Sequence, residues 1–250
     1  YYLSTNQTRA ESANSAQQFD YMDAWNDGTE TSGDYVSWAW KRHAGFDAVT
    51  YEGLEMTGGR QIPHSMGITP EMMWVFRRNG DDNWAVYHKG LNGGTNSEQY
   101  DIHLNLTNAE ADNTTWNDTA PTATHFSVSP NSNEVNQDNK DFIALLFASV
   151  NGISKVGSYT GTGSTGLSVN VGFQPRLIIF RGTNMGGPWR VLDSVRGMSS
   201  GNDKSLSLNT NAAQVTNFDW LDVTSTGFTI NTTDGEANAS GKNYIYYCHA

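Results

Sequence analysis

Three tryptophans stand among side chains that are suited to holding a sugar. Trp25, Trp116 and Trp220 each lie in a stretch rich in Asn, Asp and Thr, such as residues 114–118. An indole face can stack on the C–H surface of a sugar ring while amide and carboxylate groups bind its hydroxyls. The structural alternative is that each tryptophan closes the end of a β-sandwich core. The sequence therefore offers Trp25, Trp116 and Trp220 as candidate glycan contacts, with that alternative open.

Residue types that could perform hydrolysis occur without the partners that hydrolysis needs. Residues 161–166 read Gly-Thr-Gly-Ser-Thr-Gly, which does not have the G-x-S-x-G register of a hydrolase nucleophile and has no P-loop lysine. Glu52 and Glu55 lie three positions apart, so in an extended strand they point to opposite faces and cannot flank one glycosidic bond. We therefore expect no enzyme activity and no catalytic residues.

Candidate metal ligands are dispersed along the chain. The 6 histidines form no H-E-x-x-H pair. Asp101 and His103 are two residues apart, which places them on one face of an expected strand, either as ligands or as structural side chains. Residues 81–83 and 138–141 offer carboxylates for Ca²⁺ but complete no known calcium loop, and solvated turns are the alternative. We expect no cofactor and assign no metal site.

One alternating strand pattern, Asp or Asn followed by aromatic and aliphatic residues, recurs and organises the chain. Its three copies are residues 34–40, 141–147 and 243–249, at offsets of 107 and 102. A shorter aromatic-x-apolar strand precedes each copy at a nearly constant distance, at residues 19–21, 126–128 and 228–230. Such self-similarity at a fixed period indicates tandem structural units.

Other pieces occur twice in the same order. The matched pairs are residues 67–77 with 172–181, Trp84 with Trp189, and the Leu-x-Leu segments 104–106 with 206–208. We therefore divide the chain into the C-terminal half of an upstream repeat (1–40), a first complete repeat (41–148) and a second (149–250). On this interpretation the chain begins inside a repeat.

Short apolar runs separated by Gly, Asn, Asp and Pro predict an all-β protein. Each repeat of about 100 residues has the size of one antiparallel β-sandwich, of a jelly-roll or lectin-like kind. Both faces of the strand at 141–147 are apolar, which predicts a central position in its sheet.

The charge balance limits the classes of partner. The chain of 250 residues has 15 basic and 26 acidic side chains, a net charge of −11, and no basic run. We therefore expect neither nucleic-acid nor membrane binding, because both need clustered positive charge or a long apolar span. The 1 cysteine allows no internal disulfide bond.

The pattern G-[IF]-x-P-x-[ML]-[MI]-[WI]-[VI]-F-R, followed by W-x-V, an L-x-L strand and a closing [YF]-[VI] strand, resembles tandem β-repeat modules in virion proteins of marine tailed phages. Those modules belong to tail fibres, spikes and appendages. A similarity to concanavalin-like lectin sandwiches exists at the level of the fold. The resemblance implies a non-enzymatic structural and adhesive component of an extracellular virion fibre. Its expected partners are further copies of the chain, other virion proteins and a host-surface glycan.

Two other functions compete with this interpretation. The first is a stand-alone carbohydrate-binding module of a secreted protein, which would bind glycans through Trp116 or Trp220. The second is a polysaccharide depolymerase, which needs two carboxyl groups about 5–10 Å apart across a groove.

Overall fold

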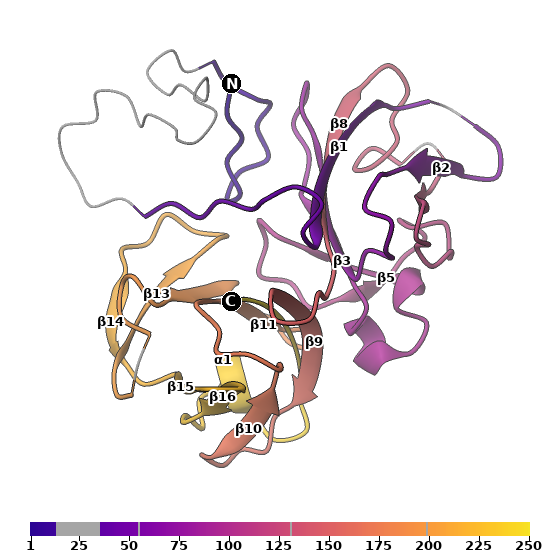
Figure 1. Cartoon of the computed structure of the whole chain (residues 1–250). Helices are drawn as coiled ribbons and strands as arrows, with labels where there is room; N and C mark the ends of the chain where they lie inside the picture. Colours follow the sequence, from indigo (N-terminus) through magenta and orange to yellow (C-terminus); the bar gives the residue numbers. More distant parts are fainter. Residues whose placement is uncertain (14–35, 55, 131, 199) are drawn as a thin grey trace.

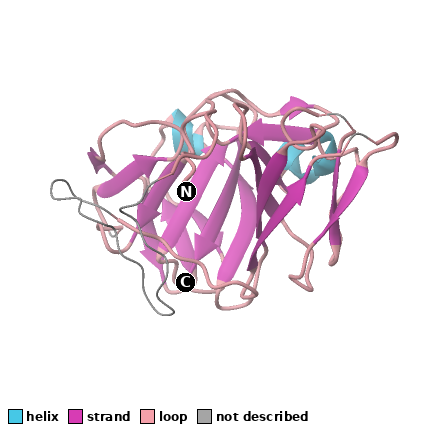
Figure 2. Cartoon of the chain, turned by 90° about the horizontal axis from the view of Figure 1, so that it is seen from above, coloured by secondary structure: helices cyan, strands magenta, loops and turns pink. Residues whose placement is uncertain are grey.

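Both halves of the chain fold as antiparallel β-sheets, and the predicted all-β fold is confirmed. The computed structural model describes residues 1–13, 36–54, 56–130, 132–198 and 200–250. Strands dominate the whole molecule, as Figure 2 shows. Among the described residues, no helix is long and apolar enough to cross a membrane.

The first sandwich consists of a large and a small sheet. Its strands are β1 (Phe46–Glu52), β2 (Arg60–Pro63), β3 (Met72–Arg77), β4 (Ala85–His88), β5 (Tyr100–His103), β6 (Ala111–Asp112), β7 (His125–Val128) and β8 (Asp141–Phe147). The large sheet has the order β1-β8-β3-β4-β5-β6, and β2 pairs with β7 in the small sheet. Two 3₁₀ turns, η1 (Leu91–Gly94) and η2 (Ser97–Gln99), precede β5.

The second sandwich repeats this plan. Its elements are β9 (Ser154–Thr160), β10 (Leu167–Asn170), β11 (Leu177–Gly182), β12 (Arg190–Asp193), β13 (Asp203–Ser207), β14 (Val215–Phe218), β15 (Leu221–Thr224), β16 (Gly227–Ile230), the short helix α1 (Gly235–Asn238) and β17 (Asn243–His249). The large sheet has the order β14-β13-β12-β11-β17-β9, and the small sheet has the order β10-β16-β15.

The two large sheets share one apolar core, which we call the inner core. On β3, Trp74 and Phe76 belong to it, and on β11 Ile179 does. The ring of Phe147 on β8 lies 5.1 Å from that of Tyr247 on β17. The two sandwiches, which follow one another in the colour ramp of Figure 1, are therefore joined by buried side chains as well as by the chain.

The opposite face of each large sheet packs on its own small sheet. Met73 and Val75 of β3 belong to the core of the first sandwich, and Ile178 and Phe180 of β11 to that of the second. Because successive side chains of a strand point to opposite faces, each large sheet is apolar on both sides. The predicted central position of residues 141–147 is confirmed, since β8 pairs with β1 on one side and β3 on the other.

The first copy of the repeated strand behaves differently from the other two. Residues 36–40 form no strand, whereas the matching residues 141–147 and 243–249 are β8 and β17. Instead, Trp40 packs on the inner core, and its Nε1 donates to the hydroxyl of Tyr247 at 3.1 Å. The preceding segment, residues 19–21, lies outside the described residues.

The sequence match between the two Leu-x-Leu segments was wrong by two residues. The amide of Leu104 donates to the carbonyl of Trp84, and that of Leu208 donates to the carbonyl of Trp189, each at 3.0 Å. Leu104 therefore corresponds to Leu208 and not to Leu206. A pattern that alternates with period two matches itself after a shift of two, and only the hydrogen bonds distinguish the two registers.

Candidate metal centre

Strand β5 places two candidate ligands side by side. Asp101 and His103 point to the same face of the strand, as their spacing predicts. The residue between them, Ile102, points the other way and lies in the inner core. Packing of Ile102 therefore fixes the direction in which Asp101 and His103 face.

A loop between β7 and β8 brings a third ligand, Glu134, to this face. The buried amide of Asn136 holds the loop: its Nδ2 donates to the carbonyls of Leu54 and Ser129, and its Oδ1 accepts from the amide of Leu54 at 3.1 Å. Asn136 is fully buried, so these bonds are shielded from water. The position of Glu134 follows from this anchor two residues later.

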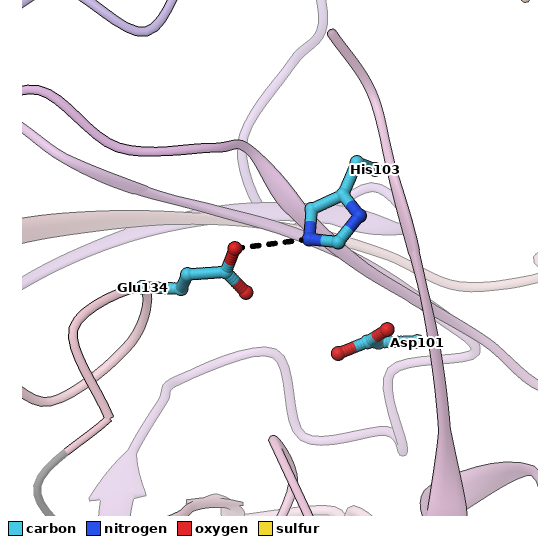
Figure 3. Close-up of side chains that lie close together, drawn as sticks. All are labelled: Asp101, His103 and Glu134. Atoms are coloured by element: carbon cyan, nitrogen blue, oxygen red, sulfur yellow. Dashed lines mark hydrogen bonds and ion pairs between the residues drawn. The ribbon is translucent and has the colours of Figure 1, made fainter. Parts of the chain in front are cut away.

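The three side chains face one another (Figure 3). Nε2 of His103 lies 3.0 Å from Oε1 of Glu134. One potential ligand atom from each of Asp101, His103 and Glu134 lies within 4.8 Å of the other two. A nitrogen and two carboxylate oxygens at this spacing are a donor set for a divalent metal ion.

Asp101 lies deepest in the cluster, with a residue exposure of 1%. Its Oδ2 accepts hydrogen bonds from Oγ1 of Thr115 and from Nδ2 of Asn113, the latter at 3.0 Å. Its Oδ1 is buried and has no hydrogen-bond partner among the residues that the structure describes. A buried carboxylate oxygen without a partner is unfavourable unless a cation or donor satisfies it.

The electrostatics of the cluster follow from burial and proximity. Burial raises the pKa of Asp101 more than the hydrogen bonds from Thr115 and Asn113 lower it. Burial lowers the pKa of His103, but the bond to Glu134 and the charges of Glu134 and Asp101 outweigh it, so the net shift is upward. The His103 bond likewise lowers the pKa of Glu134 against the effect of burial. The imidazole and the two carboxylates therefore stabilise each other's charged forms, whereas Glu134 disfavours the charge of Asp101.

A chain of amides orients Glu134. Its Oε1 accepts from Nδ2 of Asn83 at 3.0 Å, and Oδ1 of Asn83 accepts from Nδ2 of Asn105 at 2.9 Å. Oδ1 of Asn105 in turn accepts from the amide of Trp84 at 2.9 Å. The carboxylate is thus connected to the backbone of the large sheet, which limits its movement.

In the second sandwich, the side chain of an arginine supplies a positive charge beside the corresponding glutamate. Ala85 pairs with His103, and Arg190 pairs with Ser207, so Arg190 corresponds to Ala85 and Ser207 to His103. Nη2 of Arg190 lies 2.7 Å from Oε2 of Glu236, the counterpart of Glu134. The same acidic position therefore has an arginine partner in one sandwich and a histidine and aspartate in the other.

Neither predicted tryptophan that the structure describes offers a ring to a ligand. Trp116 is 0% exposed and Trp220 is 2% exposed. Trp116 packs with Tyr87 in the core of the first sandwich, and Trp220 packs with Phe218 and Phe180 in the second. The expectation that a glycan stacks on these two residues is therefore wrong. Both indole rings are buried in the cores of the sandwiches, as the structural alternative proposed. Trp25 lies outside the described residues.

Trp38 and Trp40 are the described tryptophans with partly exposed side chains. Trp38 lines a groove of about 240 Å³ together with Arg176, Asp193 and Val195. Its Nε1 lies 3.3 Å from Oδ2 of Asp193, and the guanidinium of Arg196 lies 5.5 Å from its ring. A half-exposed ring beside charged and apolar groups is thus present at a place the sequence did not indicate.

Sequence reasoning found two of the three clustered residues. It noted Asp101 and His103 as a pair but missed Glu134, which is 31 positions beyond His103. A signal existed: Glu134 and Glu236 are separated by 102 residues, the same offset as β8 and β17. The aspartate-rich turn at residues 81–83 binds its own chain, with Oδ1 of Asp81 accepting from the amide of Ala10 at 3.1 Å.

Comparison with family models matches residues 2–250 to a domain of unknown function, DUF7483. No curated protein and no solved structure matches the chain. The match spans the N-terminal segment and both sandwiches, so the family model treats this pair of sandwiches as one unit.

Proposed function

The chain belongs to the DUF7483 family, and we propose that it is a non-enzymatic structural and adhesive component of an extracellular phage fibre or appendage. The proposed building block is the pair of sandwiches. Its proposed partners are further copies of the chain, other virion proteins and a host-surface glycan.

The observation that carries the proposal is the inner core between the two large sheets. Its members come from both sandwiches, among them Trp74 and Phe147 of the first and Ile179 and Tyr247 of the second. Burial of this surface opposes hinging between the repeats. A stiff pair of repeats suits a part that must hold its shape at the surface of a particle.

Polar bonds across this junction support the same role. Nη1 of Arg181 donates to the carbonyls of His103 at 2.7 Å and Leu106 at 2.9 Å, and Nη2 donates to that of Asn108. Nε1 of Trp189 donates to the carbonyl of His103 at 2.9 Å. In the first sandwich, Nε1 of Trp84 donates to the carbonyl of Ser4 at 3.1 Å. Each sandwich therefore binds backbone from the segment that precedes it, as serial assembly requires.

The two clustered acids Asp101 and Glu134 do not favour a depolymerase. Asp101 and Glu134 are near neighbours, but Asp101 is 1% exposed, so a polysaccharide chain cannot reach its carboxylate. Glycosidases instead place both acids on an open cleft.

The Trp38 groove favours glycan contact as the adhesive part of the role. Val195 at its edge is 79% exposed, which gives a sugar ring an apolar surface beside the exposed side chain of Arg176. A groove of about 240 Å³ is smaller than a typical ligand pocket, so it fits a terminal sugar rather than a long segment of polymer.

Mass spectrometry of intact, purified phage particles that encode the chain tests the structural role. We expect the chain in a fixed copy number that matches the symmetry of a fibre, and a homo-oligomer of the recombinant chain by light scattering. Absence of the chain from particles, together with a monodisperse monomer at high concentration, would overturn the proposal.

A glycan array tests the adhesive part separately. Trp38→Ala and Val195→Ser should each abolish binding to the glycan that the unmodified chain selects, while Leu54→Ser, at an exposed apolar residue that does not line the groove, serves as the control. Binding that survives both groove substitutions, or no binding to any glycan, would remove the glycan from the proposal.

A further inference from the structure

We propose that Asp101, His103 and Glu134 bind a divalent transition-metal ion of the Zn²⁺ class, which ties the 129–140 loop of the first sandwich to strand β5. The inference is independent of the proposed function, since it concerns the stability of one sandwich and not its partners.

The arrangement of the donors comes first. The potential ligand atoms of the three residues lie within 4.8 Å of one another and converge on one space (Figure 3). In a tetrahedral Zn²⁺ site with bonds of about 2.0 Å, ligand atoms lie about 3.3 Å apart. Small side-chain rotations would therefore bring all three into coordination, and water would take the fourth position.

The partnerless Oδ1 of Asp101 is a second and independent observation. It is buried with no hydrogen-bond partner among the described residues, while Oδ2 of the same carboxylate is held by Thr115 and Asn113. The carboxylate is thus fixed in an orientation that leaves one of its two buried oxygens unsatisfied. A metal ion there would satisfy it and offset the cost of burying it.

The charge of the cluster points to the same conclusion. Two carboxylates against one imidazole leave net negative charge whichever protonation state His103 has. Arg181 adds positive charge nearby and thereby lowers the pKa of His103, but its Nη1 and Nη2 donate to the carbonyls of His103, Leu106 and Asn108 and not to the two carboxylates. A divalent cation would supply the missing positive charge.

The second sandwich supports this inference by contrast. There, the guanidinium of Arg190 forms an ion pair with Glu236 at 2.7 Å, and Ser207 replaces His103. The first sandwich has Ala85 in place of that arginine and instead places two further potential ligands around Glu134. The two repeats therefore neutralise the same acidic position in two ways: the second with the guanidinium of Arg190, and the first with the proposed metal ion.

The donor set selects the class of metal. Ca²⁺ and Mg²⁺ take oxygen ligands almost exclusively, whereas an imidazole nitrogen with two carboxylates suits Zn²⁺ and its neighbours. We therefore expect Zn²⁺ to bind far more tightly than Ca²⁺ or Mg²⁺.

Calorimetric titration of the full, EDTA-stripped chain with Zn²⁺, Ca²⁺ and Mg²⁺ tests the site. We expect saturable binding of Zn²⁺ at one equivalent with a Kd of about 1 μM or below. Asp101→Asn and His103→Gln should each weaken it at least about 10-fold. Glu236→Gln, which removes the matching carboxylate of the second sandwich, is the control and should bind Zn²⁺ as the unmodified chain does.

Thermal unfolding gives a second readout that does not depend on the variants being fully stable. Zn²⁺ in excess over EDTA-treated protein should raise the Tm of the unmodified chain by about 5 °C and leave that of Asp101→Asn within about 1 °C of its own metal-free value. The proposal would be overturned by no saturable Zn²⁺ binding, by ligand variants that bind Zn²⁺ as tightly as the unmodified chain, or by equal affinity for Ca²⁺.

Discussion

The two sandwiches share one strand frame and differ in how they satisfy the same positions. Glu134 in the first faces His103 and Asp101, whereas Glu236 in the second is bound by Arg190. The pairing of the strands determines the positions of these side chains, whereas the residue types beside the glutamate differ between the two sandwiches. The repeat therefore specifies a place for an acidic side chain, and each copy surrounds that side chain with different partners.

A second pair of positions shows the same divergence in the inner core. The rings of Phe76 and Trp84 stack at 4.4 Å in the first sandwich. In the second, Arg181 takes the place of Phe76, and its guanidinium lies 5.4 Å from the ring of Trp189. The arginine adds hydrogen bonds to the neighbouring sandwich that a phenylalanine cannot make. Substitutions in the two sandwiches test these differences.

The largest effect should come from the buried tryptophans Trp116 and Trp220. Replacement of either by alanine should lower the free energy of unfolding by about 3–5 kcal/mol, because both rings are buried and leave cavities. Urea unfolding followed by circular dichroism measures the loss. A loss below about 1 kcal/mol would contradict the buried positions.

Replacement of these tryptophans by phenylalanine should separate the two sites. Nε1 of Trp116 donates to the carbonyl of Tyr100 at 3.1 Å, whereas Nε1 of Trp220 has no hydrogen-bond partner among the described residues. Trp116→Phe should therefore cost about 1 kcal/mol more than Trp220→Phe in the same assay. Equal costs would mean that the Trp116 bond contributes nothing.

Arg181→Phe gives the second sandwich the residue that the first has at the corresponding position, Phe76. It should lower the free energy of unfolding by about 3 kcal/mol, because the carbonyls of His103, Leu106 and Asn108 lose their hydrogen bonds from a charged guanidinium. Arg176→Gln, on the exposed side chain nearby, is the control for loss of charge. A neutral result for Arg181→Phe would show that apolar packing alone joins the sandwiches.

A pH effect should arise at His88, which corresponds to Asp193. Burial lowers the pKa of His88 to about 4, with Lys89 lowering and Glu71 and the Tyr246 carbonyl raising it. Because the unfolded chain binds this proton more strongly, stability falls as the pH drops from about 6.5 to about 4. Between pH 7 and pH 5 we expect a loss of about 2 kcal/mol.

The variant His88→Gln tests this assignment. Its Nε2 amide can still donate to the carbonyl of Tyr246, the bond that His88 makes across the two sandwiches at 3.2 Å. The difference between unmodified chain and variant in urea unfolding should therefore shrink as the pH falls from 7 to 5. A constant difference over that range would assign the pH dependence to other groups.

The smallest effect should come from Arg190→Gln. The pair with Glu236 is partly exposed, so we expect a loss of about 1 kcal/mol that diminishes in high salt. Metal addition should not restore it, because Ser207 stands where His103 would be needed. Rescue of this variant by Zn²⁺ would remove the distinction between the two sandwiches.

The positions of most strands could be predicted because the alternation of apolar residues within each short segment indicates them. The alternation in residues 141–147 and 243–249 identifies strands that are buried on both faces. The same pattern in residues 36–40 forms no strand, since strand formation also needs a neighbour with which to pair. Local pattern therefore predicted the type of most elements but not this pairing.

The site could be predicted only in part. The spacing of Asp101 and His103 placed them on one face of β5, but Glu134 reaches them through the loop that Asn136 anchors. The same limit applies to Trp116, whose polar neighbours in sequence indicate a surface position although the ring is buried. Neighbours along the chain say little about neighbours across a core.

The sequence by itself determined the all-β class, the repeated strand pattern and which side chains share a strand face. Each follows from the period-two geometry of an extended chain. The tertiary structure alone decided that the two large sheets share a core, that Trp116 and Trp220 lie inside, and that Glu134 completes a cluster with Asp101 and His103. Those outcomes depend on which faces of the sheets are buried. Burial results from packing between segments that are distant in sequence, and no local pattern specifies it.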